Sequence, residues 1–157
     1  MPHPWLERSF PGLRGTDYDV TSPATPDYNC IAWAAADSQQ WWEPDPFHQY
    51  FWPANAPRSQ RAESYLAAFA TLGYEVCASS EVEAGFEKIA LYANRDGIPT
   101  HMARQLHDGT WTSKLGPSVD IRHPSLESLE GAQYGRLLTV LRRRRANLRP
   151  LPAERTE

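Results

Sequence analysis

The sequence predicts an α+β fold in which helices come first and an antiparallel β meander follows. Between residues 59 and 72, apolar side chains recur at helical spacing. From residue 87 to residue 115 the period changes to short strand-like runs, which are separated by the turn signals Asn94-Arg95-Asp96-Gly97 and Asp108-Gly109. We therefore expect N-terminal helices that pack on an antiparallel meander.

Length and composition indicate the domain boundaries. The chain has 157 residues, of which 41% are hydrophobic, and this suits one domain with an ordinary core. We predict a single α+β domain over residues 25–146, with an irregular lead-in over residues 1–24 and a basic and polar tail over residues 147–157. The lead-in contains several prolines and lacks a sustained period, so it is expected to lie over the surface.

Charge and cysteine content restrict the function classes. A formal net charge of −3 makes nucleic acid an unlikely partner and argues against an anionic membrane surface. Two cysteines are too few for a disulfide framework and form no Cys-x-x-Cys pair, which suits a reducing compartment. The N-terminal residues lack a basic leader and an apolar run, so we expect a cytoplasmic protein, with signal-independent export left open. We expect no cofactor and no metal; the oligomeric state is not readable.

The stretch from residue 25 to residue 36 predicts a helix that carries Cys30 near its start. Either Thr25 caps this helix, or Asn29 caps it and places Cys30 in the first turn. In both cases the sulfur lies near backbone N–H groups that lack helical partners, an environment that favours the thiolate. A lone cysteine is more often a small buried apolar residue, so a role in chemistry depends on a partner. His101 is the candidate partner.

An aromatic cluster follows the expected end of this helix at residue 39 or 40. It consists of Trp41, Trp42, Phe47, Tyr50, Phe51 and Trp52, interrupted by prolines. One interpretation is a wall or lid that grips a substrate, because aromatic side chains bury a large area at a small entropic cost. The other interpretation, which the frequency of such clusters under loops favours, is that these rings cover the core.

The remaining elements follow from periodicity and turn signals. They are a helix over Ser59–Leu72 and strands over Tyr74–Cys77, Glu87–Ala93, Thr100–Leu106 and Thr110–Leu115. A short helical turn is expected over Ser125–Glu130 and a final strand over Tyr134–Leu141. The arginines 142–145 are interpreted as a solvated chain end rather than a phosphate contact, because the protein is acidic and no aromatic residue lies between them.

The turn at Asp108-Gly109 sets the register of the second and third strands of the meander. If it is a two-residue turn, His101 pairs with Gly116. One face then carries Met102, Leu106, Trp111 and Leu115, and the other carries His101, Gln105, Thr112 and Lys114. A bulge near the turn would exchange these faces.

The order of these elements resembles the papain-like cysteine hydrolases, including the NlpC-type peptidases and related amidases. The resemblance covers roughly residues 26–115 and depends on Asn-Cys-Ile-Ala-Trp-Ala around Cys30 and on Pro-Thr-His-Met-Ala around His101. It implies a papain-like fold with Cys30 as nucleophile and His101 as base. The family's orienting residue falls at 112–115, where Lys114 can only donate hydrogen bonds. Asp120 and Ser113 are the two candidates for that role, and it is assigned to Asp120, the only nearby carboxylate.

The resemblance also implies an activity. A thiolate at Cys30, formed by proton transfer to His101, attacks an amide carbonyl, and water or an amine resolves the thioester. We therefore expect a cysteine-dependent amidase, peptidase, deamidase or acyltransferase that acts on a peptide or another amide-containing substrate. The residues assigned to substrate binding are Asn29, Trp33, Trp41, Trp42 and Trp52.

Two other functions were weighed against this one. The first is a non-catalytic papain-like module with an idle cysteine, which binds a partner through the aromatic loop from Trp41 to Trp52. The second is a catalytic zinc site formed by Cys30, His101 and Asp120, which the absence of closely spaced ligand pairs disfavours.

Overall fold

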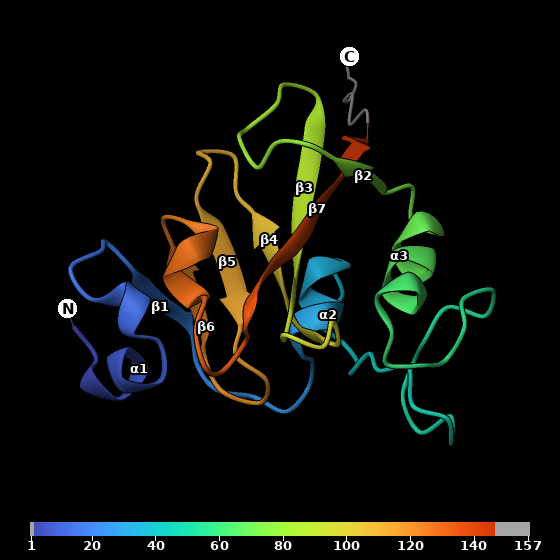
Figure 1. The fold of residues 1–157 in the computed structure, drawn as a ribbon, viewed down its shortest axis with the longest axis horizontal. Coiled ribbons are helices and arrows are strands. Elements are labelled where there is room, and N and C mark those ends of the chain that lie inside the picture. Colours follow the sequence, from blue (N-terminus) through green and yellow to red (C-terminus); the bar gives the residue numbers. More distant parts are fainter. Residues whose placement is uncertain (1, 147–157) are drawn as a thin grey trace, which may run out of the picture.

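A computed structural model describes residues 2–146. Seven strands form one antiparallel sheet in the order β1-β6-β5-β4-β3-β7-β2, shown in Figure 1. The strands are β1 (Asp19–Ser22), β2 (Glu75–Cys77), β3 (Phe86–Ala93), β4 (Pro99–Gln105), β5 (Trp111–Lys114), β6 (Asp120–His123) and β7 (Arg136–Arg144). The α+β class and the antiparallel meander are confirmed.

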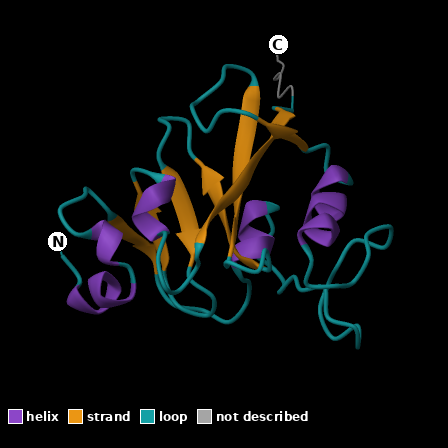
Figure 2. Cartoon of the chain, viewed as in Figure 1, coloured by secondary structure: helices purple, strands orange, loops and turns teal. Residues whose placement is uncertain are grey.

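Helices cover both faces of the sheet. They are α1 (Pro4–Ser9), the 3₁₀ helix η1 (Pro11–Leu13), α2 (Cys30–Ala34), α3 (Ala62–Ala70) and the 3₁₀ helix η2 (Leu126–Leu129). Figure 2 shows α1, η1 and η2 gathered at one side of the strands, and α2 and α3 at the other. Among the described residues, no helix is long and apolar enough to cross a membrane.

The core consists of two clusters, one on each face of the sheet. Strand β3 shows the division, because Ile89 and Leu91 pack with α2 and α3, whereas Ala90 and Tyr92 pack with α1, η1 and η2. Successive side chains of a strand point to opposite faces, which produces this alternation. All four side chains are fully buried.

The lead-in is more regular than its composition indicates. Residues 4–13 form α1 and η1, which bury Leu6 and Leu13, and residues 19–22 form the edge strand β1. This strand pairs with β6, which lies about a hundred residues later in the chain. Four residues are too few to show a strand period, so the pairing partner, not the local pattern, determines the element.

The helix that carries Cys30 is shorter than predicted and ends at Ala34 rather than at residue 39 or 40. Asn29 is its cap, since the side-chain oxygen accepts a hydrogen bond from the Ala32 N–H at 3.1 Å. Ala36 adopts a left-handed conformation with φ of 62°, which terminates the helix. The alanine-rich sequence gave no sign of this end, because the usual residue there is glycine.

The predicted register of the meander is wrong by one residue. Arg104 pairs with Thr112, and Gln105 pairs with Trp111, so the connection is a three-residue loop that contains Gly109 at φ of 92°. Met102 and Trp111 therefore belong to opposite core clusters instead of sharing a face. The extra loop residue exchanges the faces of the third strand.

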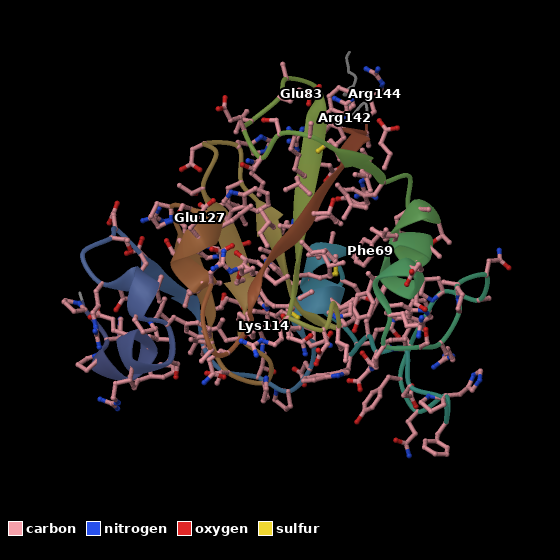
Figure 3. The ribbon with its side chains drawn as sticks, in the orientation of Figure 1. Phe69, Glu83, Lys114, Glu127, Arg142 and Arg144 are labelled. Carbon is pink, nitrogen blue, oxygen red and sulfur yellow. The ribbon has the colours of Figure 1, made fainter. Side chains whose placement is uncertain are left out.

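The arginines 142–144 belong to β7 and are not a solvated chain end. Arg142 forms ion pairs with Glu75 and Glu83, and its guanidinium lies 4.2 Å from the centre of the Phe86 ring. Figure 3 shows Glu83, Arg142 and Arg144 together where β3 and β7 approach each other. Acidic partners across the sheet compensate this basic run. The predicted tail, residues 147–157, lies outside the described residues.

Candidate functional site

Cys30 lies in a pocket of about 260 Å³ at the end of the sheet where β4 begins and β5 ends. The pocket is lined by Asn29, Cys30, Ile31, Trp41, Glu43, Gln60, Tyr65, Pro99, Thr100, Gly116 and Tyr134. A larger pocket of about 670 Å³ lies between residues 93–95 and residues 130–136 and contains neither a cysteine nor a histidine. The smaller pocket is therefore the candidate site, since it holds the buried cysteine together with neighbouring polar side chains.

The sulfur of Cys30 occupies a gap between two strands. The β4–β5 ladder comprises only Arg104 and Gln105 on β4, so the Met102 amide faces the start of α2 instead of β5. The backbone N–H groups of Met102, Ile31 and Cys30 itself lie close enough to the sulfur to lower the pKa of the thiol. These donors could stabilise negative charge on the sulfur or on an oxygen bound beside it.

Burial nevertheless dominates the acidity of this thiol. Removal from water raises the pKa of Cys30 to about 11, and the three N–H groups and the charge of Lys114 oppose this only in part. At neutral pH the resting side chain is a thiol. A nucleophilic role therefore requires a base that takes its proton when a substrate binds.

His101 is buried, with 2% of its surface exposed. Its ring stacks on Tyr134, with centroids 4.0 Å apart and planes inclined by 3°, and lies 5.4 Å from the ring of Tyr92. Neither ring nitrogen has a hydrogen-bond partner among the described residues. Burial, and after it the repulsion between the protonated forms of His101 and His123, holds the pKa of His101 well below its ordinary value, so the ring is neutral at pH 7.

Tyr134 connects Cys30 with His101. It lines the pocket that contains Cys30, and its ring stacks on that of His101. The side chain of Met102 packs in the cluster of Cys30, so strand alternation directs its neighbour His101 toward the other face. No hydrogen bond joins Cys30 to His101. The two residues thus approach from opposite sides at the beginning of β4, without forming a dyad in this state.

Asp120 does not orient His101 in this structure. Its Oδ2 accepts a hydrogen bond of 2.7 Å from the Tyr28 hydroxyl, and its buried Oδ1 has no partner among residues 2–146. In the β5–β6 ladder Asp120 pairs with Lys114. The hydroxyl of Tyr28 consequently has its pKa raised to about 12, first by burial and then by this carboxylate.

Lys114 is a structural tie at the same end of the sheet (Figure 3). Its buried ammonium donates to the carbonyl oxygens of Thr25 at 2.7 Å, Gly116 at 2.5 Å and Ser118 at 2.8 Å. An ammonium has three protons, so these three bonds satisfy it fully. The residue therefore joins the segment before α2 to the β5–β6 turn, and fixes the two walls between which Cys30 lies.

Asn29 is likewise occupied by the protein itself. Its Oδ1 accepts from the Ala32 and Trp42 N–H groups, both at 3.1 Å, and its Nδ2 donates to the Trp42 carbonyl at 2.7 Å. The side chain thus closes the start of α2 and fastens the aromatic loop to it. Asn29 lines the pocket through its position, while its polar atoms have partners elsewhere.

The four tryptophans assigned to substrate binding occupy different places. Trp42 and Trp52 are buried in the core with 5% and 4% of their surface exposed. Trp33 lies outside the pocket lining, where its indole N–H donates to Thr112 at 2.7 Å. Trp41 alone lines the pocket with Cys30. The aromatic loop is thus part wall and part core.

The lining residues that the sequence did not assign to the site include Glu43, Gln60, Tyr65 and Tyr134. Tyr65 was expected only as an apolar position of the second helix; it donates a hydrogen bond of 3.0 Å to Gln60. Glu43, directly after the tryptophan pair, was the one available signal, since a carboxylate in an aromatic run is unusual. Within residues 2–146, no three His, Cys, Asp or Glu side chains are grouped so as to hold a metal ion.

The fold and the pocket define a class: an α+β protein built on one antiparallel sheet, with a cysteine at a helix start and a buried histidine whose ring stacks on a tyrosine of the cysteine's pocket. A family model described as a domain of unknown function, DUF7689, matches residues 19–142, and the chain belongs to this family. No curated protein and no solved structure matches the chain. The matched range includes β1 through most of β7 and all of the residues assigned to the site.

Proposed function

We propose that the protein is a papain-like, cysteine-dependent hydrolase or acyltransferase that acts on an amide bond. Cys30 is the nucleophile and His101 the base. The observation that carries the proposal is a buried, neutral imidazole with two unpartnered nitrogens, which stacks on a tyrosine in the wall of the pocket that holds the cysteine. Leaving buried polar atoms without partners costs stability, so such a group indicates a role beyond packing.

The protonation states support this chemistry. His101 has a depressed pKa and is neutral, which is the form that accepts a proton, while Cys30 has a raised pKa and retains its proton until the site is engaged. In the proposed step the Cys30 proton moves to a ring nitrogen of His101 and the sulfur attacks the amide carbonyl. The N–H groups around the sulfur bind the resulting oxyanion, the amine leaves with the proton, and water or a second amine cleaves the thioester.

The step requires a rearrangement at the beginning of β4, because the two side chains lie toward opposite faces of the sheet and no hydrogen bond joins them. Catalytic hydrogen bonds are often long or absent before substrate binds. Tyr134 lies between them: it lines the pocket of Cys30, its ring stacks on His101, and its backbone carbonyl accepts a hydrogen bond of 2.5 Å from the Thr100 hydroxyl.

The test is the pH dependence of alkylation by iodoacetamide at Cys30, measured by peptide mass spectrometry with the half-buried Cys77 as the internal control. An isolated thiol of pKa about 11 has about one part in 10,000 as thiolate at pH 7. We expect a plateau of Cys30 reactivity between about pH 6 and 8 that exceeds this fraction, and its loss by at least tenfold in His101→Leu. Cys77 should be unchanged.

The opposite result would be equally clear. A Cys30 rate that rises tenfold with every pH unit toward pH 11, with or without His101, would show an unassisted thiol and remove the proposal. Burial of Cys30 slows the reagent by the same factor at every pH, so it does not change the shape of the pH–rate profile. Poor access of the reagent therefore cannot produce the plateau expected for an activated thiol.

A second candidate function, a binding module, has one observation in its favour. Phe47 is 80% exposed at the tip of the aromatic loop, and Tyr50 and Phe51 are about 40% exposed beside it. Large exposed rings close together are typical of a contact surface. Replacement of Phe47 by serine should weaken binding to a partner without altering Cys30 alkylation, which separates this function from the first.

A further inference from the structure

The charge of the Cys30 pocket comes from one residue. Of the eleven lining residues, Glu43 alone carries a side chain that is ionised at neutral pH under ordinary conditions. The others are apolar, aromatic, amide, hydroxyl or thiol side chains, or glycine. Glu43 is thus the one acidic side chain of the lining, while the buried Lys114, whose positive charge lowers the pKa of Cys30, lies outside the lining.

Glu43 is held in place by its surroundings. The Trp41 indole N–H donates to Glu43 Oε1 at 3.2 Å. The Glu43 N–H donates to the Phe51 carbonyl at 3.0 Å, and the Phe51 N–H donates to the Trp41 carbonyl at 3.2 Å. Two loop segments thus form a short ladder that positions the carboxylate, while the ring of Tyr50 packs 6.3 Å from that of Trp41.

Apart from the Trp41 hydrogen bond, the Glu43 carboxylate has no ion pair or side-chain hydrogen bond among the described residues. Among residues 2–146, the ion pairs of arginine and lysine involve other acidic residues, and Glu43 Oε2 accepts no hydrogen bond. By contrast Asp45, two positions later, accepts two backbone N–H bonds and pairs with Arg58 at 3.0 Å. Of these two acidic groups in the aromatic loop, one is structural and the other faces the pocket.

A free carboxylate oxygen beside an indole ring suits a cation. An ammonium or guanidinium group can donate a charge-assisted hydrogen bond to the carboxylate and lie against the electron-rich face of the ring. We propose that Glu43 and Trp41 form a subsite for a positively charged group of the substrate, so that the enzyme prefers amides that carry an amine or guanidinium close to the reacting carbonyl. This inference rests on the proposed function and names its substrate class.

The experiment uses three alkylating reagents that share one reactive group. They are N-(3-aminopropyl)-, N-butyl- and N-(3-carboxypropyl)-2-chloroacetamide, which are cationic, neutral and anionic. In each reaction the Cys30 thiol loses its proton to His101, the sulfur forms a bond to the methylene carbon, and chloride leaves. The rates at Cys30 and at Cys77 are measured in the same sample by peptide mass spectrometry.

We expect the cationic reagent to alkylate Cys30 about tenfold faster than the neutral one, because one charge-assisted contact contributes that much, and the anionic reagent to be slowest. Glu43→Gln should remove the preference, and Glu43→Lys should reverse it. Glu127→Gln is the matched control, since it removes the same charge from an exposed residue of η2, which covers the other face of the sheet. The rates at Cys77 should not change in any variant.

The outcomes distinguish the two proposals. Equal rates of all three reagents at Cys30, with the His101-dependent pH profile intact, would overturn the cation subsite and leave the cysteine chemistry standing. A preference that persists in Glu43→Gln would also overturn it, because the charge would then come from elsewhere. If Cys30 shows no His101-dependent reactivity, both proposals are removed. The neutral reagent reports on folding, since its rate should be the same in each Glu43 variant.

Discussion

Two buried histidines lie on the same side of the sheet, and they differ in one respect. His123 is completely buried, its Nδ1 contacts the Ser125 carbonyl oxygen at 2.9 Å, and its Nε2 contacts the Ser113 hydroxyl at 2.8 Å. His101 is buried to nearly the same extent, yet neither of its nitrogens has a hydrogen-bond partner within residues 2–146. Burial depresses the pKa of both rings, to about 4 for His123.

This difference assigns His123 to the packing of the fold and leaves His101 free to take part in chemistry. His123 donates from Nδ1 and accepts at Nε2, which is the full capacity of a neutral imidazole. It can therefore be read as part of the packing between β6, β5 and the start of η2. Burial removes His101 from water to the same extent, but no hydrogen bond compensates the lost hydration. Its two nitrogens are therefore available to a thiol, a water molecule or a substrate.

The largest expected effect is the loss of stability on replacement of His123. His123→Leu leaves the Ser113 hydroxyl and the Ser125 carbonyl buried without partners, so the free energy of unfolding should fall by about 3 kcal/mol in urea titrations. Ser113→Ala removes one of the two bonds and serves as the graded control, with a loss of about 1 kcal/mol. If His123→Leu were as stable as the native protein, the two histidines would not differ as described.

The second effect is acid sensitivity. Both histidines have folded-state pKa values below the ordinary value of about 6.5, so the unfolded chain binds more protons than the folded one, and stability falls as the pH decreases from about 6.5. For His123 this loss continues to about pH 4 and totals about 3 kcal/mol. Between pH 5 and 6 each buried ring contributes a slope of up to about 1.4 kcal/mol per pH unit.

Urea titrations at several pH values between 5 and 7 measure this slope. Replacement of either histidine by leucine should remove about half of it, because one titrating ring remains. A slope that is the same in His101→Leu as in the native protein would mean that this ring is not held neutral by burial, which would weaken the case for a neutral base.

The smallest expected effect is a change in the stability of the His101→Leu variant. His101→Leu removes two buried polar atoms that have no partners, at the cost of the stack on Tyr134, so stability should rise slightly, by about 1 kcal/mol, as judged by the urea midpoint. The same variant is expected to abolish the enhanced reactivity of Cys30. A gain in stability together with a loss of reactivity is the pattern of a functional residue that the fold does not need. A loss of more than 1 kcal/mol would instead assign His101 to packing.

Local patterns predicted much of the fold. The strands β3, β4 and β5, the helix α3 and the 3₁₀ helix η2 follow from periods and turn signals in residues 59–130, and the structure places them within a few residues of the predicted ends. The elements that were missed or misjudged depend on distant partners. β1 exists because β6 pairs with it, and the arginines of β7 are in a strand because acidic side chains face them across the sheet.

The site was predictable in part. The start of α2 identified Cys30 and the beginning of β4 identified His101, since both are visible as local patterns. The role of His123 was hidden, because its partners Ser113 and Ser125 are revealed only by the register of β5 and β6. The register of β4 against β5, by contrast, depended on whether the loop after β4 has two or three residues, and the conformation of Gly109 decides this. Glu43 could not be placed near Cys30 from the sequence, because the aromatic loop has no period.

The pairing of β1 with β6 has a consequence for how the chain assembles during synthesis. Asp19 and Arg122 are joined by hydrogen bonds of 2.8 and 3.0 Å although they are 103 positions apart. A ribosome delivers β1 long before β6, so β1 remains without its partner while β2 to β5 are made. Until β1 docks, β6 presents an open edge to other nascent chains.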